Sequence, residues 1–361
     1  MARLSFKSTR VHLAQKGLSL VELMITLALS SALILGIFTV YLDSSRTGRL
    51  SNSLARVQES SRIAVDILAR DLRMVGFQGC ADPFAVNMNI IADNPPTGDF
   101  LQTTLRVWEV DGANWADGTE FDGTSIETDA VVGSDVIAIQ RGETVPIEVT
   151  GNMSATNANI QVAGQTELFS QNDMVLISDC ENADLFRISS QPDSNTWAHA
   201  ENVNSDNRLS QAYNDSARIY RFSSNVYYVR DTGRVDSFGN PIRGLYRARN
   251  NLLNSATPGF QIDEMVEGVE NLQVLLGEKL ASGNIRYRAA DHAGLDLTAV
   301  AAVQLGFLVS DAEEVRDDAD MGSYALPGET IGPASGGGVT HPEDRRLRRT
   351  FETTVTLRNR D

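Results

Sequence analysis

The chain has 361 residues, of which 31 are Lys or Arg and 47 are Asp or Glu, so its formal net charge at pH 7 is −16. This length suggests one large or two ordinary domains, and the 42% hydrophobic content is ample for a packed core. The acidic balance argues against a nucleic-acid partner, which needs a basic face, and four His with two Cys leave little material for a zinc cluster.

The N-terminus divides into a basic leader and an apolar run. Residues 1–17 contain Arg and Lys but no acidic residue, and Glu22 is the only charge within the apolar run Leu18–Leu42. As a helix, this run would be roughly 37 Å long, enough to cross a hydrocarbon core of about 30 Å. The positive-inside rule keeps the leader in the cytoplasm. We therefore expect a single pass through the inner membrane, with everything after Asp43 in the periplasm.

Two ordinary interpretations of this pattern compete. A cleavable secretory signal has a shorter apolar region followed by a small-x-small site, but here the matches Ala28-x-Ser30 and Ser30-x-Ala32 lie inside the run. A plain signal anchor fits the length and the charge but leaves Gly17 and Glu22 without a purpose. An ionisable residue in a membrane segment is a functional hypothesis by default, and the bland alternative is a Glu that faces lipid head groups.

The helix is predicted to continue beyond the membrane as an amphipathic segment over residues 43–79. Apolar and small residues recur there at steps of three and four, which places them on one helical face. They are Leu50, Leu54, Val57, Ser61, Ala64, Leu68 and Leu72. Gly76 and Gly79 follow and offer a stop. We expect this stripe to pack against a globular sheet.

Residues 80–361 are predicted to form a β-rich periplasmic domain. Short β-rich runs cover 134–140, 173–178, 217–222 and 225–230, and 297–309 predicts an inner strand covered on both sides. The last strand alternates from Phe351 to Leu357. For 261–276 we favour a helix to about residue 270 over one strand, and 311–345 predicts a long exposed loop. The expected fold is therefore α+β, a long N-terminal helix packed on a mainly antiparallel sheet.

The two cysteines, Cys80 and Cys180, both fall in the part expected to be exported. The periplasm is oxidising, and an even number of cysteines there favours a disulfide. Such a bond would tie the end of the long helix to a strand edge near Asp179. The alternative is two unpaired buried thiols.

The junction between leader and apolar run resembles the class III signal of type IV prepilins and type II secretion pseudopilins. The residues that carry the resemblance are Lys16-Gly17-Leu18-Ser19-Leu20-Val21-Glu22-Leu23. It implies that a membrane prepilin peptidase cuts between Gly17 and Leu18 and methylates the new amine of Leu18, where the family most often has Phe. The apolar helix is then kept as anchor and later as filament core. There Glu22 and an N-terminal amine would neutralise one another, because an unpaired buried charge is heavily penalised.

Further segments resemble PilW-type minor pilins. They are Arg70–Phe77 leading to Gly79-Cys80, Ser178-Asp179-Cys180, Val266–Gln273 and Thr353–Asn359. Leu276-Gly277-Glu278-Lys279 departs from the Tyr-Gly-x-Asp pattern of the family, so no role is carried onto these positions. The resemblance implies a low-abundance pilin that primes type IV pilus assembly and sits at the tip or base of the pilus. Its implied partners are other minor pilins, the major pilin, the prepilin peptidase and a tip adhesin.

No catalytic arrangement rises above chance. His199, His292 and His341 have no metal-pair spacing, and Asp231–Asn240 is better explained as a hairpin loop than as a calcium site. We expect no enzyme activity, no cofactor and no metal. Two alternatives stay open: a minor pseudopilin of a type II secretion system, and a membrane-anchored periplasmic binding or adhesion domain. Loss of pili, loss of secretion or a ligand-dependent phenotype on deletion would separate the three.

Overall fold

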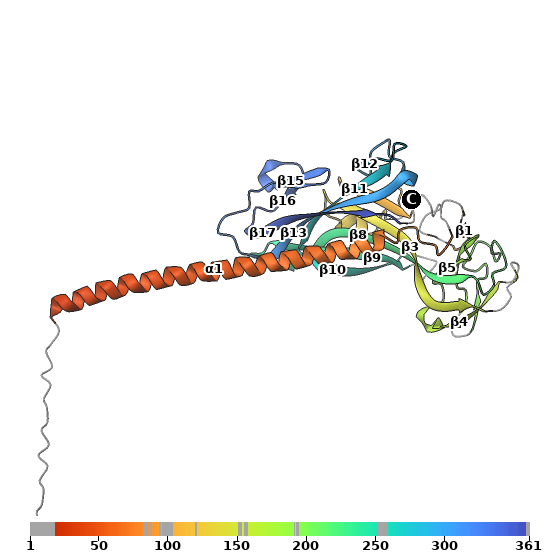
Figure 1. Cartoon of the computed structure of the whole chain (residues 1–361), viewed down its shortest axis with the longest axis horizontal. Helices are drawn as coiled ribbons and strands as arrows, with labels where there is room; N and C mark the ends of the chain where they lie inside the picture. The colour runs from red at the N-terminus through yellow and green to blue at the C-terminus, as the bar shows by residue number, and fades with distance from the viewer. Residues whose placement is uncertain are drawn as a thin grey trace, which may run out of the picture. The chain divides into compact units, whose positions relative to one another are not determined.

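The computed structural model describes residues 19–81, 86, 88–93, 95, 104–119, 121–150, 154, 158–190, 192, 195–251 and 259–358. The chain forms two compact units, Met1–Ser51 and Asn52–Asp361. Helix α1, Leu20–Leu72, contributes to both of them. Its first part is the described portion of the first unit, and its last part belongs to the β-rich second unit, whose elements are shown in Figure 1.

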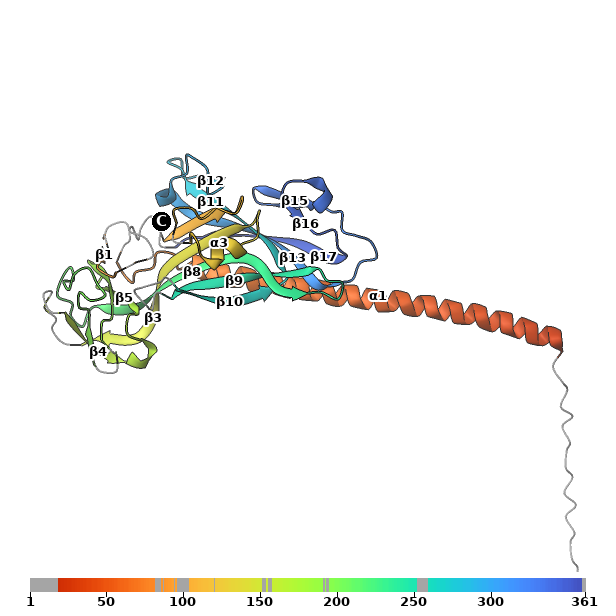
Figure 2. The same cartoon turned by 180° about the vertical axis from the view of Figure 1, so that it is seen from behind.

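The larger sheet of the second unit has ten strands. They are β1 (Asn89–Ile90), β2 (Leu105–Glu109), β3 (Asp135–Val149), β4 (Asn159–Gly164), β5 (Met174–Ser178), β6 (Ala183–Arg187), β7 (Thr196–Ala198), β8 (Arg218–Val235), β9 (Pro241–Asn251) and β10 (Gly259–Glu267). Their order is β1-β6-β5-β8-β3-β4-β7, with β2 on β3, β9 on β8 and β10 on β9. Figure 2 shows β8, β9 and β10 side by side. All these pairs are antiparallel except β1 with β6.

A second, four-stranded sheet is antiparallel throughout. It contains β11 (Val269–Lys279), β12 (Ile285–Arg288), β13 (Val300–Glu314) and β17 (Arg346–Thr356) in the order β12-β11-β13-β17. The predicted inner strand at 297–309 is confirmed, because β13 lies between β11 and β17 and is almost wholly buried. Short helical pieces complete the unit: α3 (Ser125–Asp129), η1 (Thr166–Leu168), η2 (Leu297–Ala299) and η3 (Ala334–Gly336).

Two local predictions were wrong. The helix favoured up to about residue 270 is absent, because residues 259–279 form β10 and β11, separated at Gly268, which has φ +87°. The segment 311–345 is not a plain exposed loop. It begins inside β13 and carries a small sheet of β14 (Tyr324–Leu326), β15 (Glu329–Pro333) and β16 (Thr340–His341). Asp320 and His341 within it are buried.

The main hydrophobic core lies between the end of α1 and both sheets. The predicted helical stripe is buried from Val57 to Leu72, although Leu50 at its start is exposed. Val57 and Leu68 pack with Ile139 of β3, Leu272 of β11 and Leu305 of β13 in one cluster. This core explains why the stripe has helical period, since only one face of α1 meets the sheets. The observed architecture is therefore the predicted long helix on a mainly antiparallel β-sheet domain.

Candidate functional site

The start of α1 carries the residue that the sequence singles out for assembly. The amide of Leu23 donates to the carbonyl of Ser19 at 3.0 Å, so helical hydrogen bonding begins there. Glu22 lies in the first turn and is exposed. Gly17 and Leu18 lie outside the described residues, so the cleavage and methylation site stays a prediction. An amine on Leu18 would be four residues before Glu22, about one helical turn.

The apolar part of α1 exposes its side chains on every face. All residues from Leu20 to Leu42 are exposed, with Leu20 at 73% and Val40 at 69%. Among the described residues, α1 is long and apolar enough to cross a membrane. A helix that is apolar all round requires a lipid or protein environment. The structure therefore agrees with membrane anchoring through this segment.

Hydroxyl groups within this apolar segment are satisfied by the helix itself. Thr26 donates to the carbonyl of Glu22 at 3.0 Å, Ser30 to Thr26 at 2.6 Å and Ser31 to Leu27 at 2.7 Å. A hydroxyl without a partner is costly in hydrocarbon, whereas one bonded to the preceding turn is tolerated. With these hydroxyls satisfied, Glu22, the only charge of the apolar run, is the polar group that still needs a partner.

The other end of α1 is joined to the large sheet by a buried carboxylate. Asp71 is 5% exposed and accepts from Arg141 at 3.0 Å, Asn225 at 2.7 Å and the Tyr227 hydroxyl at 2.6 Å. Burial and the neighbouring Asp71 carboxylate raise the pKa of Tyr227, so the phenol stays protonated and donates. A carboxylate near a helix C-terminus is disfavoured by the helix macrodipole. The three donors compensate for this, and they fix the end of α1 to the large sheet at Asp71.

The chain leaves α1 along strand β3. The amide of Gly76 donates to the carbonyl of Gln140 at 3.0 Å, and that of Gly142 donates to Phe77 at 2.7 Å. Gly79 has φ +81°, and a Cβ there would lie 2.6 Å from the Tyr220 hydroxyl. Only glycine combines this backbone conformation with so close a neighbour. The exit from the helix is therefore held in one path.

The path ends at the predicted disulfide. Cys80 is bonded to Cys180, with a Cα–Cα distance of 4.6 Å and a sequence separation of 100. Cys180 lies in the turn between β5 and β6, where Asp179 accepts from the amides of Glu181 at 3.2 Å and Asn182 at 3.0 Å. The prediction that the bond joins the helix end to a strand edge near Asp179 is confirmed.

Buried ion pairs hold the segment that was expected to be an exposed loop. Arg348 of β17 is fully buried and contacts Glu270 at 2.7 Å, Asp320 at 3.2 Å and Asp344 at 2.7 Å. Although burial raises the pKa of Asp320, hydrogen bonds from the Tyr324 hydroxyl, the Gly322 amide and Arg348 lower it below its usual value. The charge of Asp320 is thus retained at neutral pH, where it binds the segment to β17.

Arg346 makes a second buried link from β17. It contacts Asp236 at 2.8 Å in the turn of the β8–β9 hairpin and donates to the carbonyl of Asn240 at 3.0 Å. Burial raises the pKa of Asp236, but hydrogen bonds from the Asn240 amide and Arg346 outweigh it and lower the pKa to about 2. The predicted hairpin over 231–240 is confirmed, and its acidic residues accept from the hairpin's own amides and from Arg346.

The three histidines singled out in the sequence differ in their surroundings: His199 and His341 are buried, and His292 is exposed beside Arg288. His199 is fully buried beside Phe186, and burial lowers its pKa to about 4, so its ring is neutral. His341 is buried beside Tyr324. The two rings lie beside different hydrophobic clusters, because Phe186 and Tyr324 belong to separate ones. The geometry around α1 is therefore that of an anchor and a docking element, and we find no arrangement among the described residues that suggests catalysis.

Comparison with known proteins agrees with this picture. Residues 226–359 match the family model described as type IV pilus-assembly protein W, and residues 13–38 match the prokaryotic N-terminal methylation motif. No curated protein and no solved structure matches the chain. The first match covers most of β8 and every later strand, and the second runs from the leader into the apolar part of α1. The resemblances at Lys16–Leu23, Val266–Gln273 and Thr353–Asn359 lie within these matches and are thereby confirmed. Those at Arg70–Cys80 and Ser178–Cys180 lie outside both matched ranges and stay predictions.

Proposed function

We propose that the chain is a minor pilin that takes part in assembling the type IV pilus. The matches to the PilW model and to the methylation motif support this proposal. In this proposal the prepilin peptidase cuts between Gly17 and Leu18 and methylates Leu18. The apolar part of α1 first anchors the protein in the inner membrane, with the β-rich domain in the periplasm. It then enters the filament beside other minor pilins and the major pilin, in a priming or tip complex that also offers a place for an adhesin.

One observation carries the proposal: the methylation motif continues directly into a helix whose apolar surface is uncovered. Cleavage on the N-terminal side of that helix preserves the apolar segment, whereas an ordinary signal peptidase would remove it. A helix that is apolar on every face is stable in lipid and equally stable in a bundle of like helices. The same segment therefore serves as anchor and as filament core, and the protein acts as a structural component without chemistry of its own.

Glu22 is proposed to set the position of the subunit in the filament. A carboxylate in an apolar bundle needs a cationic partner, because burying it unpaired is costly. The methylated amine of Leu18 remains cationic and would be presented at the same depth in each subunit. Pairing of Glu22 with a neighbour's amine would fix the axial register of the two helices.

The first test is the N-terminus of the membrane-extracted protein, determined by intact mass and N-terminal sequencing in strains with and without the prepilin peptidase. We expect a chain that begins at methylated Leu18 only when the peptidase is present. A start at Met1 or Ala2 in both strains would mean a plain signal anchor. A start beyond residue 30 would mean a secreted protein, and either result rejects the proposal.

The second test concerns Glu22. Glu22→Gln removes the charge and keeps the size, so the protein should be processed and inserted normally, while surface pili fall at least tenfold. The matched control is Glu59→Gln, an exposed position later in the same helix. Normal piliation in Glu22→Gln would contradict the proposed role of this carboxylate. In a deletion strain, loss of secretion with intact pili would instead favour a type II pseudopilin. Intact pili with a ligand-dependent defect would favour a binding domain.

A further inference from the structure

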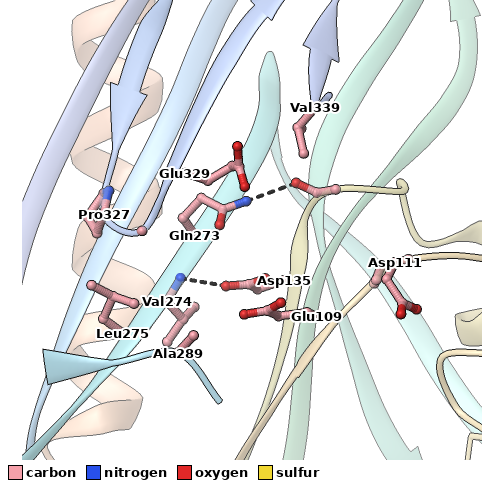
Figure 3. A pocket seen from close by; sticks show the side chains of 13 residues that line it. Glu109, Asp111, Asp135, Gln273, Val274, Leu275, Ala289, Pro327, Glu329 and Val339 are labelled. Carbon is pink, nitrogen blue, oxygen red and sulfur yellow. Dashed lines mark hydrogen bonds between the residues drawn. The ribbon is translucent and has the colours of Figure 1, made fainter. Parts of the chain in front are cut away.

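A cavity of about 260 Å³ lies in the second unit where the two sheets meet. Its walls come from the end of β2, the start of β3, the middle of β11 and the turn between β14 and β15 (Figure 3). Four carboxylates line it, Glu109, Asp111, Asp135 and Glu329. None of the described residues in its wall carries a positive charge. The cavity is therefore acidic and has no counter-charge of its own.

Two of these carboxylates are forced together by strand pairing. Glu109 of β2 is the direct register partner of Asp135 of β3, and Figure 3 shows their carboxylates side by side. Like charges directly opposite each other on antiparallel strands destabilise the pair. The sheet register thus brings two carboxyl groups together at the cavity, and Glu329 adds a third from the start of β15.

Asp135 points to a missing partner most directly. Its residue is only 5% exposed, and its Oδ2 accepts from the amide of Val274 at 2.7 Å. Its Oδ1 has no hydrogen-bond donor among the described residues, although the side chain lines the cavity. Burial, together with the carboxylates of Glu109, Asp291 and Glu329, raises the pKa of Asp135 to about 8, although the hydrogen bond from the Val274 amide lowers it. Burial and the carboxylates of Asp291, Glu329 and Asp111 raise the pKa of Glu109 as well.

The shape of the site favours an extended cation over a metal ion. Within the described residues, three acidic side chains bring their oxygens within 4.8 Å of one another only at Asp117, Asp122 and Glu127, outside this cavity. Around the carboxylates the wall is aliphatic, with Leu275 and Pro327 among its members. Lys and Arg pack their methylene stems on such surfaces while the charged head reaches polar groups.

We call this cavity the acidic pocket and define it by Glu109, Asp111, Asp135 and Glu329. We propose that the acidic pocket receives a lysine or arginine side chain of a neighbouring pilin subunit. The head group would lie between Glu109, Asp135 and Glu329, and the Oδ1 of Asp135 would accept its N–H. The side chain of Gln273, which also lines the pocket, is held in place because its amide nitrogen donates to the Gly133 carbonyl at 2.8 Å. The identity of the partner as a pilin rests on the proposed function, whereas the chemistry of the pocket does not.

The chemistry is tested with the full-length protein in detergent and three small probes. These are acetyl-arginine methylamide, acetyl-lysine methylamide and the uncharged isostere acetyl-citrulline methylamide, with binding followed by ligand-observed NMR. We expect saturable binding of both cations and at least tenfold weaker binding of the citrulline compound. The variant Glu109→Gln/Glu329→Gln should weaken cation binding at least tenfold. The charge-matched control Glu167→Gln/Glu201→Gln, at exposed positions, should bind as the wild type does.

Three results would overturn the proposal. They are equal binding of the citrulline compound, unchanged cation binding by the double pocket variant, and calcium chloride binding the pocket more tightly than either organic cation. A further variant, Glu329→Lys, places a cation on the pocket's own wall. It should abolish probe binding and raise the thermal unfolding midpoint, and a lowered midpoint with retained binding would contradict the proposed site.

The role in assembly is tested in cells. Glu109→Gln/Glu329→Gln should reduce the number of surface pili, while the mature N-terminus and the amount of protein stay as in the wild type. Weakened probe binding with a normal number of pili would overturn the contact with a neighbouring pilin. If deletion of the whole protein leaves pili intact, the proposed function fails, and probe binding still decides the chemistry of the pocket.

Discussion

Asp71 at the end of α1 and Asp135 at the start of β3 are each 5% exposed, yet their surroundings differ. Asp71 receives three side-chain donors, one of them the guanidinium of Arg141. Asp135 receives one backbone amide and faces Glu109 across the strand pair. Burial of a carboxylate is tolerated when donors and a cation surround it and is costly otherwise. The Asp71 carboxylate has its donors within this chain, whereas the Asp135 carboxylate lacks a cation among the described residues, as expected for a group that meets one from another molecule.

The largest effect should come from opening the disulfide that closes the junction around Asp71. Cys80→Ser/Cys180→Ser releases a loop of about 100 residues, which should lower the free energy of unfolding by about 4 kcal/mol in the chain-entropy model. Urea unfolding of the full-length protein measures this. Wild type treated with reductant should match the variant. Two alkylatable thiols in the untreated native protein would contradict the bond.

Removing the Asp71 carboxylate should have the next largest effect. Asp71→Ala leaves Arg141, Asn225 and Tyr227 without their common acceptor inside the domain. Breaking a buried charge pair on one side is strongly destabilising, and we expect a loss of about 3 kcal/mol in urea unfolding. Asp66→Ala, at an exposed position of the same helix, should change little. Equal effects of the two substitutions would mean that Asp71 is no anchor.

Gly79 tests how tightly the chain is held between Asp71 and the disulfide. Gly79→Ala adds a Cβ at φ +81° that would lie 2.6 Å from the Tyr220 hydroxyl, so we expect a loss of about 2 kcal/mol. Gly118→Ala is the matched control, because Gly118 has φ +74° but no atom within 4 Å of the new Cβ. That control isolates the backbone term, and a loss as large as that of Gly79→Ala would show that the contact with Tyr220 adds nothing.

Asp135→Asn should have the smallest effect near pH 4, and its effect should grow as the pH rises. The folded pKa of Asp135 is raised to about 8, so between about pH 4 and pH 8 the folded state binds a proton that the unfolded chain has lost. The stability of the wild type therefore falls as the pH rises through this window. Asn does not titrate, so the variant should gain up to about 1.4 kcal/mol on the wild type for each pH unit between pH 4 and pH 8. A difference between the two proteins that does not vary with pH would argue against the raised pKa.

The parts of the fold that could be predicted from the sequence are those with a clear period. The stripe from Val57 to Leu72 alternates at helical spacing because only one side of α1 is covered. Strand β11 has no such signal. It is buried on both faces, so its apolar residues follow one another without a strand period, and a helix was wrongly favoured just before it. The network at Arg348 was missed because its carboxylates, Glu270, Asp320 and Asp344, are distant in sequence or lie in a glycine-rich segment.

The candidate sites divide in the same way. The segment around Glu22 could be recognised because a lone charge in an apolar run is rare, and the pair Cys80–Cys180 followed from the compartment and the even count. The acidic pocket could not be predicted, because Glu109 and Asp135 meet only through the register of β2 on β3. Asp71 had one available signal, a negative charge at a helix C-terminus, where the macrodipole disfavours it.

The disulfide also decides how the domain carries tension. In the proposed filament a subunit would be pulled at α1, whose last part belongs to the second unit, and the main chain would carry the force onward from Leu72. At Cys80 the covalent path crosses directly to Cys180. The main chain between Cys80 and Cys180, which includes β3 and its Arg141, is thereby bypassed by the disulfide and does not carry the force. Tension would then reach β6 and the later strands first, among them β8, whose Asn225 and Tyr227 hold Asp71 at the helix end.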